Sequence, residues 1–404
     1  MKKSLLPFIL FWAAVLFLWS CESSLEDTDP SAVDVGRTDG TLYSEAGGGG
    51  SSSGGGNGQG QEPEPGVITA GEWKDLDHWD FWQNLFNEKD YEKMPEYWGF
   101  DLQNRFALEI KQSNGQPAID VPVTLKAGNE TIWQAKTDNK GRAELWGNIF
   151  APAMGRLQSE DWTISIDGGN MTIQDPTPYQ GEVQQVTYTP NRQVENRAEL
   201  AFVVDATGSM SDELEYLKTE LLDVIQRAKS ENPGTSFLTG SVFYRDTEDE
   251  YLTRESPFSS DIQTTLSFIE DQEANGGGDF PEAVHTALSK AIRELQWSSQ
   301  TRARLLFLLL DAPPHYETQI VDEMHDLTQL AAAKGIKIIP ITASGIDKET
   351  EFLMRFMGNA TNGTYVFITN HSGIGNDHLE PSIGEYEVEY LNVLMVRLFG
   401  EAVE

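Results

Sequence analysis

The residues of this chain best suited to chemistry are oxygen-bearing side chains that follow an apolar run. Asp205, Thr207 and Ser209 come directly after residues 201–204, Ala-Phe-Val-Val, and only Ala206 and Gly208 separate them. A buried parallel strand that ends at Asp205 would present these side chains on one turn at the carboxyl edge of a sheet. Carboxylate and hydroxyl oxygens favour Mg²⁺, Mn²⁺ or Ca²⁺ over Zn²⁺. The cluster therefore predicts a divalent-cation site.

Two further carboxylates can reach the same place. Asp311 ends a second apolar run, residues 305–310, and Asp279 follows a glycine hinge at residues 276–278. In an open α/β sheet, the loops at the carboxyl ends of neighbouring strands converge on one crevice. Carboxylates about 4 Å apart would repel by about 4 kcal/mol at an effective dielectric of about 20, so the site should depend strongly on its cation. The expected ligands are Asp205, Thr207, Ser209, Asp279 and Asp311.

Each of these residues also has a purely structural interpretation. Ser209 and Asp212 form Ser-x-x-Asp, a pattern typical of helix capping. Asp279 stands just before Pro281, where it can cap a helix, and Asp311 can simply end a strand. A carboxylate at the end of each of two buried strands is hard to explain without a cation, so the sequence favours the metal site.

The nearby polar residues carry a weaker signal. Tyr244-Arg-Asp246 follows another predicted strand, and we expect a salt bridge between Arg245 and Asp246, with partner selection as the alternative. His315 follows two prolines and is expected to be a turn residue. No His-Glu-x-x-His, Cys-x-x-Cys or Gly-x-Ser-x-Gly motif is present.

Taken in order, these motifs resemble the von Willebrand factor type A family over residues 195–404. The resemblance rests on Asp205-Ala-Thr-Gly-Ser209, Tyr244-Arg-Asp246, Gly276-Gly-Gly-Asp-Phe-Pro-Glu282 and Leu310-Asp-Ala-Pro-Pro-His315. The first is similar to the family's metal-ion-dependent adhesion site, Asp-x-Ser-x-Ser, with Thr for the first Ser.

The resemblance implies a function as well as a fold. It implies that Asp205, Thr207 and Ser209 contact an ion or its waters, that Asp311 lies near it, and that Mg²⁺ is the expected cation. An acidic residue of a protein partner would then fill an open position on the ion. The integrin version of the fold has a neutral threonine where this chain has Asp279, and a carboxylate there would weaken the pull on an acidic partner.

Strands and helices alternate beyond residue 195, which predicts an α/β, doubly wound and mostly parallel sheet of the Rossmann-like type. The expected strands end at Asp205 and span 237–243, 305–310, 336–341 and 365–368. The expected helices follow Asp205, run from Pro281 to Trp297, reach Lys334, lie near Phe352 and close the chain from Tyr390.

Two other segments precede this domain. Alternating apolar residues and Asn-Gly or Gly-Gly turns over 101–190 predict a small antiparallel β-sandwich. Residues 137–145 resemble a turn of immunoglobulin-like or carboxypeptidase-regulatory-like modules. Residues 67–100 are rich in tryptophan, including Trp73, Trp79 and Trp82, which we expect to dock onto a neighbouring domain rather than to bind a ligand.

The amino-terminal residues predict an anchor and a tether. Residues 1–20 have a basic start and an apolar core, and Leu18-Trp-Ser-Cys21 resembles a bacterial lipobox, so we expect cleavage and lipidation at Cys21. An uncleaved membrane helix is the alternative, but the apolar segment is short for a span. Residues 21–66 are acidic and rich in Gly and Ser, which predicts a flexible linker; no Gly-Lys-Ser/Thr follows to make a phosphate loop.

Charge and motifs together define the expected function. The net charge of −35 argues against nucleic acid as a partner. We expect a non-enzymatic adhesion protein, lipid-anchored in a bacterial envelope at the outer membrane or cell surface. One alternative is a Mg²⁺-dependent hydrolase of the haloacid dehalogenase type, which would need an Asp where Thr207 stands. Another is an envelope scaffold in which the metal is only structural.

Overall fold

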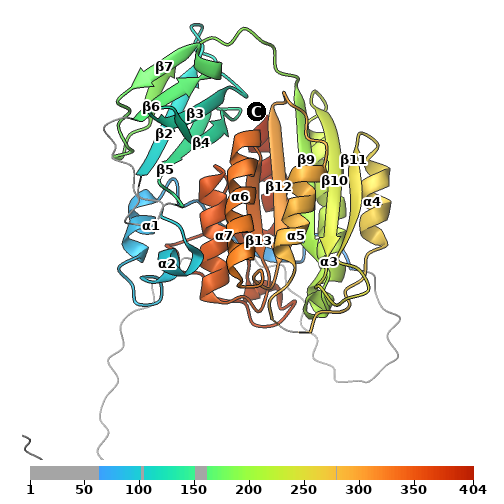
Figure 1. The fold of residues 1–404 in the computed structure, drawn as a ribbon. Helices are drawn as coiled ribbons and strands as arrows, with labels where there is room; N and C mark the ends of the chain where they lie inside the picture. Colours follow the sequence, from blue (N-terminus) through green and yellow to red (C-terminus); the bar gives the residue numbers. More distant parts are fainter. Residues whose placement is uncertain (1–62, 102–103, 151–161, 279) are drawn as a thin grey trace, which may run out of the picture. The chain divides into compact units, whose positions relative to one another are not determined.

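The structure is a computed structural model that describes residues 63–101, 104–150, 162–278 and 280–404, and element labels follow Figure 1. Asp279, Cys21, the expected signal peptide and the tether up to residue 62 lie outside the described residues. Within the described ranges, none of the helices combines the length and the apolar character needed to span a bilayer.

The described chain is built around an eight-stranded sheet in the order β11-β10-β9-β12-β13-β14-β1-β15. The pairings from β10 through β9, β12 and β13 to β14 are parallel, whereas those made by β11, β1 and β15 are antiparallel. The predicted α/β fold with a mostly parallel sheet is therefore confirmed. The strands are β1 (Thr69–Trp73), β9 (Arg197–Asp205), β10 (Ser236–Tyr244), β11 (Thr253–Ser259), β12 (Ala303–Leu310), β13 (Lys337–Thr342), β14 (Tyr365–Ile368) and β15 (Val388–Tyr390).

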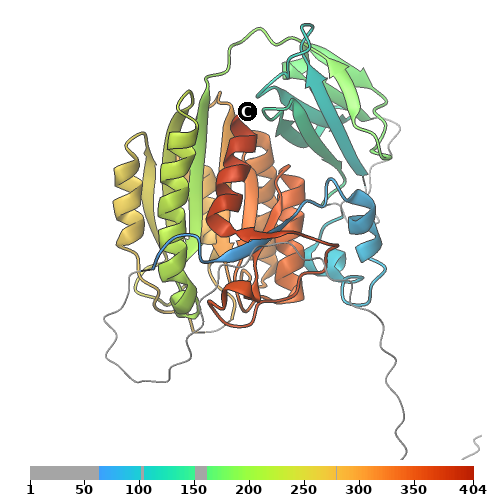
Figure 2. The same cartoon turned by 180° about the vertical axis from the view of Figure 1, so that it is seen from behind.

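Helices cover both faces of this sheet. Along β9, Phe202 and Val204 pack into one hydrophobic cluster and Ala201 and Val203 into another, because successive side chains of a strand point to opposite faces. One face carries α3 (Ser211–Glu231), α4 (Ile262–Glu270) and α8 (Leu391–Val403), seen in Figure 2. The other carries α5 (Val284–Ser289), α6 (Thr318–Lys334) and α7 (Lys348–Ala360), seen in Figure 1.

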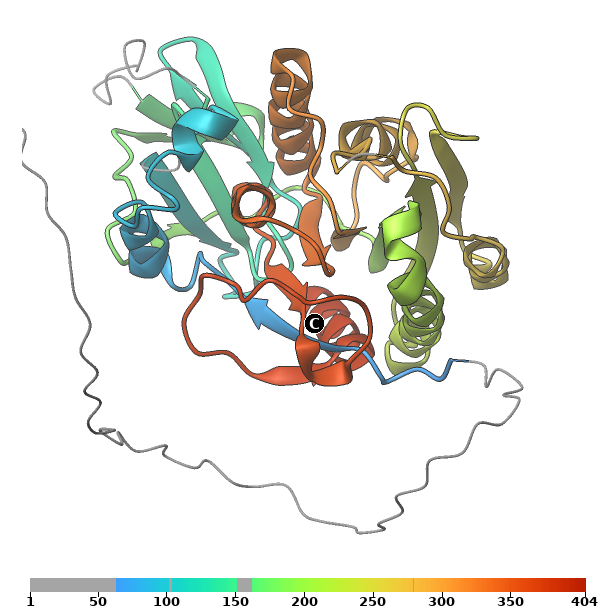
Figure 3. The same cartoon turned by 90° about the horizontal axis from the view of Figure 1, so that it is seen from below.

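The order of the strands creates a crevice at the end of β9. The chain passes from β9 to β10 on one side, while β12 pairs with β9 on the other. The register places Tyr244 opposite Asp205 and Leu309 opposite Val204, so all three strands finish at the same edge. Figure 3 views this edge of the sheet. Open α/β sheets bind their ligands at such a switch point.

The tryptophan-rich segment does more than the expected docking, because it adds β1 to the central sheet. Ala70 pairs with Ile368 of β14 and, on the other side, with Glu389 of β15. The sheet therefore extends beyond the expected 195–404 boundary. The two short helices that follow, α1 (Trp79–Leu85) and α2 (Met94–Trp98), are also buried against the domain, and the Trp82 ring stacks on Phe352 of α7 at 5.2 Å.

Two local expectations about the elements need correction. The hairpin partner β11 and helix α4 were not predicted, because β11 is a polar edge strand that contains Pro257 and lacks a clear apolar alternation. The helix expected from Pro281 begins only at Val284 and ends in a π-helical turn, Lys290–Glu294. Glu282 instead forms an extended bridge to Pro314.

Residues 104–187 form two small sheets, with orders β5-β2-β8 and β4-β3-β6-β7. The four-stranded sheet is antiparallel, but β8 runs parallel to β2, so the expectation of an entirely antiparallel sandwich is wrong at that strand. The immunoglobulin-like comparison is not confirmed. The strands are β2 (Asn104–Lys111), β3 (Pro122–Ala127), β4 (Glu130–Lys136), β5 (Arg142–Gly147), β6 (Trp162–Ile166), β7 (Met171–Gln174) and β8 (Gln184–Thr187).

Candidate metal centre

Asp205 is the last residue of β9 and is completely buried. Its Oδ1 accepts hydrogen bonds from the Thr207 backbone N–H at 2.9 Å and from the Thr207 hydroxyl at 2.7 Å. Its Oδ2 is buried and has no hydrogen-bond partner within the described part of the chain. A buried carboxylate oxygen without a donor is unfavourable, which makes Oδ2 available to a cation.

Thr207 and Ser209 are held together in the turn that follows. Their hydroxyl oxygens lie 3.1 Å apart, and Ser209 belongs to a short 3₁₀ turn, Gly208–Met210. Helix α3 begins at Ser211 with Met210 as its N-cap, and no side chain caps it. The capping-box interpretation of Ser209 is therefore wrong, and both hydroxyls remain beside Asp205.

Asp311 follows β12 at the same edge and is 4% exposed. Its Oδ1 is buried without a hydrogen-bond partner among the described residues, as is Oδ2 of Asp205. The register that pairs Leu309 with Val204 brings the strand ends that carry Asp205 and Asp311 side by side. Asp205, Thr207, Ser209 and Asp311 therefore lie at one edge of the sheet, as the sequence predicts. Asp279 lies outside the described residues.

A glycine loop is locked against this turn. The Gly208 N–H donates to the Gly276 carbonyl at 3.0 Å, and the Gly277 N–H donates to Asp249 Oδ2 at 2.8 Å. Gly276 and Gly277 have φ of +81° and +70°, a region that favours glycine. A Cβ on Gly277 would lie 2.9 Å from Glu282 Oε1 and 3.3 Å from Thr207 Cβ. The glycines thus allow two loops to approach closely.

The expected salt bridge between Arg245 and Asp246 is not formed. Arg245 instead donates to the carbonyls of Ala206 at 3.1 Å and Glu273 at 2.8 Å, so it supports the loop after β9. Asp246 Oδ1 lies 2.7 Å from Nε2 of His315, which is therefore more than a turn residue. The only sequence signal for the contact between Asp246 and His315 was that each residue follows the end of a predicted strand.

Two buried glutamates near the site were missed by sequence reasoning. Glu282 is 3% exposed and its Oε2 has no hydrogen-bond partner in the described ranges. Glu213, in the first turn of α3, is 1% exposed; its Oε1 accepts from the Ser344 N–H at 3.2 Å and lies 2.9 Å from His378 Nε2. Glu282 stood within a quoted motif, Gly-Gly-Gly-Asp-Phe-Pro-Glu, and that position was its only signal.

Burial and mutual repulsion make the carboxyls of this region hard to ionise. Burial raises the pKa of Asp205 to about 6. Burial, together with the charges of Asp205 and Glu213, raises the pKa of Asp311 to about 7. Burial, together with the charges of Asp205, Asp246 and the other nearby carboxyls, raises the pKa of Glu282 to about 9. A divalent cation would reverse this pattern because it stabilises the charged forms.

The residues present fit a hard divalent cation. They offer carboxylate and hydroxyl oxygens, and Asp205 and Asp311 each direct a buried oxygen to no protein donor among the described residues. No group of three acidic, histidine or cysteine side chains in the described ranges has the arrangement of a metal site. The candidate therefore depends on hydroxyls as well as carboxylates, as the spacing of Asp205, Thr207 and Ser209 predicts.

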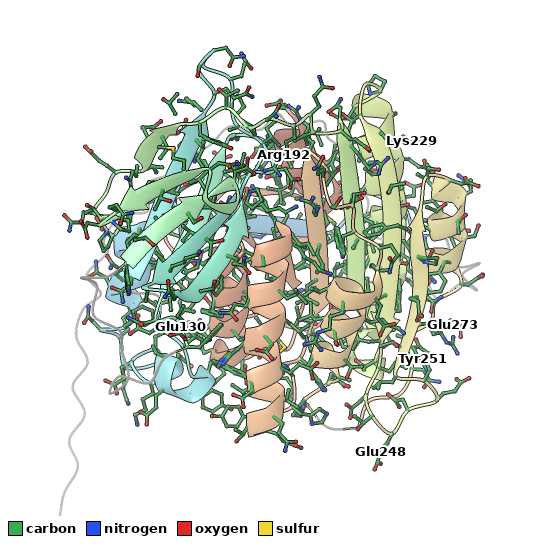
Figure 4. The ribbon with its side chains drawn as sticks, turned by 45° about the horizontal axis from the view of Figure 1, so that its top comes forward. Glu130, Arg192, Lys229, Glu248, Tyr251 and Glu273 are labelled. Carbon is green, nitrogen blue, oxygen red and sulfur yellow. The ribbon has the colours of Figure 1, made fainter. Side chains whose placement is uncertain are left out.

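Further acidic residues stand at the same end of the sheet. Figure 4 shows Glu248, Tyr251 and Glu273 there, whereas Lys229 and Arg192 lie near the opposite end. Arg245, which could offset this charge, is turned toward backbone carbonyls and stacks on the Tyr251 ring at 4.3 Å. This end of the sheet is therefore suited to attract cations.

Comparison with known proteins gives matches to parts of this chain. A segment of 124 residues is 33% identical to an ariadne-like RING finger protein of Acanthamoeba polyphaga mimivirus, covering 31% of this chain and 12% of that protein. A segment of 119 residues is 29% identical to the alpha-protein kinase vwkA of Dictyostelium discoideum, covering 29% of this chain and 19% of the kinase. The matched segments are thus a small part of both relatives.

Among solved structures, the conserved hypothetical protein BatB from Bacteroides thetaiotaomicron aligns with a TM-score of 0.36 and 14% identity, covering 51% of this chain and 98% of BatB. The family model described as von Willebrand factor A domain matches residues 199–374. That range contains all four motifs on which the resemblance rests, together with the strands β10 and β12 and the end of β9 that position them. Residues 199–374 of this chain are a von Willebrand factor A domain.

Proposed function

We propose that this protein is a non-enzymatic binding protein whose von Willebrand factor A domain engages a protein partner through a divalent cation, Mg²⁺ being the first candidate. The observation that carries the proposal is the pair of buried oxygens, Asp205 Oδ2 and Asp311 Oδ1, that have no donor among the described residues. Asp205, Thr207, Ser209 and Asp311 would hold the ion, with Asp279 as a further candidate ligand. The ion would supply an open position for an oxygen of the partner.

The hydrolase alternative is not favoured by any contact in this region. Its general acid would occupy position 207, where the Thr207 hydroxyl is instead hydrogen-bonded to Asp205 at 2.7 Å. A phosphatase assay in Mg²⁺ is the direct check on this point. Turnover that disappears in Asp205→Asn would replace the binding function with an enzymatic one.

Aromatic side chains beside the candidate metal centre offer surface for a partner. Phe280 is 45% exposed and Tyr316 is 51% exposed, and both stand in the loops that carry Glu282 and Asp311. The ring of Tyr316 stacks on Tyr97 at 4.0 Å, which holds it in place. Exposed, ordered aromatic residues are typical of protein interfaces. We include this aromatic surface in the proposed binding face.

The test uses the full chain as an affinity bait for proteins extracted from the source organism. The proposal expects a partner to be retained with Mg²⁺, released by EDTA, and not retained by Asp205→Asn. The exposed Glu248→Gln variant, at the same end of the sheet, is the control and should retain the partner (Figure 4). A partner that binds equally with EDTA would instead support the scaffold function.

We also propose that Cys21 is the site of lipid attachment and that the protein is anchored in a bacterial envelope by this residue. The support is the sequence pattern of residues 1–21. Mass spectrometry of the mature amino terminus should find an acylated Cys21. An intact leader or an unmodified thiol would contradict this part of the proposal.

A further inference from the structure

Two exposed aromatic side chains, Tyr97 of α2 and Tyr316 of the loop after β12, are stacked on each other. Their ring centroids lie 4.0 Å apart, and the ring planes are 14° from parallel. Tyr97 is 38% exposed and Tyr316 is 51% exposed, so both rings remain accessible from solvent. We call these two residues the tyrosine pair.

The neighbours of the tyrosine pair hold it in place. The Tyr316 hydroxyl donates to the Tyr97 carbonyl at 2.7 Å, and both rings meet Trp98 edge to face, at 5.0 and 5.6 Å. Trp98 is buried, and its indole N–H donates to the Glu349 carbonyl of α7 at 3.0 Å, which docks α2 beside α7 (Figure 1). The tyrosine pair is therefore ordered without being buried. An ordered aromatic pair loses little conformational entropy when it binds a partner.

The tyrosine pair belongs to the same loop as the candidate metal centre. Tyr316 is five residues beyond Asp311 in the sequence. The residue before it, His315, has its Nε2 2.7 Å from Oδ1 of Asp246. The loop that follows β12 thus connects the carboxylates at the sheet edge to the exposed rings.

The acidic side chains nearest the tyrosine pair in the sequence are unpaired. Glu96 precedes one tyrosine, Glu317 follows the other, and both glutamates are exposed. Glu349, whose carbonyl accepts from Trp98, is partly exposed. No hydrogen bond or ion pair with another described residue engages these three carboxylates. Within four positions of either tyrosine the sequence has one lysine, Lys93, and no arginine, so the protein does not neutralise this charge itself.

Acidic residues of α7 and its N-cap also act on the rings. Burial is the main cause that raises the pKa of Tyr97, followed by its stacked neighbour and by the charges of Glu349 and Asp347. Lys348 stands between these two acids in the sequence, but its ammonium group donates to Glu351 at 3.0 Å. The tyrosine pair therefore presents neutral rings in a negative field, which favours a cation from a partner.

We propose that the tyrosine pair binds an arginine side chain of the protein partner. A guanidinium group is planar and permanently charged, so it can stack on an aromatic ring and pair with a carboxylate at the same time. A lysine ammonium cannot stack in this way, and a neutral sugar would gain nothing from the unpaired carboxylates. The contact belongs to the proposed binding face and so rests on the proposed function, but it does not require the cation.

The test compares a fluorescein-labelled peptide that contains two arginines spaced by glycines with its lysine counterpart. Fluorescence anisotropy measures the affinity of each for the full chain, in EDTA and at a physiological ionic strength of about 0.15 M. The two peptides carry the same charge, so the ratio of their affinities removes the general attraction to a protein of net charge −35. The proposal expects the arginine peptide to bind at least about threefold more tightly. Equal affinities would overturn it.

Variants then locate the preference for arginine. Tyr316→Leu removes one ring and should abolish the preference, whereas Tyr316→Phe restores the ring and should restore the preference. Tyr390→Leu is the control, because Tyr390 is 52% exposed and adjoins Glu389 but lies on β15. Equal losses in Tyr316→Leu and Tyr390→Leu would overturn the assignment. Should circular dichroism show that Tyr316→Leu does not fold, Tyr97→Leu removes the other ring, and an unchanged preference there contradicts the proposal.

The remaining outcomes separate this contact from the proposed function. A preference for arginine that Tyr316→Leu abolishes, without any Mg²⁺-dependent partner in the affinity experiment, would support the tyrosine pair and overturn the cation mechanism. A Mg²⁺-dependent partner together with equal peptide affinities would overturn only the role of the tyrosine pair. Binding of maltohexaose that Tyr316→Leu abolishes, without a preference for arginine, would replace the arginine contact with a sugar site.

Discussion

Within the described residues, Thr207 donates two hydrogen bonds to the Asp205 carboxylate, and both go to Oδ1. Its second oxygen, Oδ2, is left without a donor in the described part of the chain. One residue thus has one oxygen that shapes the turn and one that is free for a ligand.

Asp205→Asn should separate the two roles. The amide oxygen can still accept from Thr207, so the metal-free variant should remain folded, but the charge that faces the cation is lost. Mg²⁺ at about a hundred times its dissociation constant should raise the free energy of unfolding of the unmodified protein by about 2.7 kcal/mol. The variant should show almost none of this gain in thermal or urea denaturation. Glu248→Gln, an exposed residue at the same end of the sheet, should keep it in full (Figure 4).

Stabilisation by Mg²⁺ should increase with pH. Unfolded aspartates titrate near pH 4, whereas in the folded, metal-free protein burial raises the pKa of Asp205 to about 6 and that of Asp311 to about 7. Between about pH 4 and about pH 7 the folded, metal-free state binds more protons than the unfolded state. The free energy of unfolding therefore falls as the pH rises through this range. Mg²⁺ binds the ionised forms and removes that loss.

The measurement is the difference in melting temperature between Mg²⁺ and EDTA at a series of pH values. It should be small at about pH 5 and should reach its full size at about pH 8. Taking the difference cancels the titration of groups elsewhere in the protein. A difference that stays constant over this range would contradict the assignment of Asp205 and Asp311 as ligands.

Gly277→Ala should damage the site through the backbone. At φ +70° a Cβ is strained, and it would also lie 2.9 Å from Glu282 Oε1. We expect a loss of about 1–3 kcal/mol in the free energy of unfolding and a weaker response to Mg²⁺. Gly278→Ala is the control, because a Cβ there meets no atom within 4 Å. Similar behaviour of the two variants would argue against a tightly packed glycine loop.

Asp75→Ala should destabilise the whole domain from a position far from the metal centre. Both Asp75 oxygens accept from Arg355, at 2.6 and 3.0 Å, and the two side chains are 1% and 0% exposed. Removing Asp75 breaks this buried ion pair, which costs about 3–5 kcal/mol, although Glu351 still pairs with Arg355 at 3.1 Å. The exposed pair Arg227 and Glu231 provides the control, since Glu231→Ala should cost less than about 1 kcal/mol. Urea denaturation measures both, and equal small losses would contradict the prediction.

Much of the fold can be predicted from local patterns in the sequence. The apolar runs before Asp205 and Asp311 are long enough to specify buried parallel strands, and their alternation with amphipathic helices specifies the fold class. Strand β1 could not be predicted in this way. It has five residues, and its register depends on β14 and β15, about three hundred residues away along the chain. Short strands of this kind are defined by their partners.

The same distinction holds within the candidate site. The spacing Asp205, Thr207, Ser209 is local, so the sequence alone could place these oxygens on one turn. The pairing of Asp246 with His315, and the return of Glu282 toward Thr207, depend on which loops the sheet order brings together. For Arg245 the sequence neighbour was misleading. Asp246 is adjacent in sequence, but the Arg245 side chain donates to backbone carbonyls instead.

The sequence by itself determined the α/β class, the position of the turn that carries Asp205, Thr207 and Ser209, and the family that residues 199–374 match, because each depends on patterns that can be read along the chain. Only the tertiary structure decided that the segment before the small sheets completes the central sheet, and that Glu282 joins the carboxyl oxygens left without donors. The physical reason is that hydrogen bonds and burial between distant segments depend on strand order and loop geometry, which local propensity does not encode.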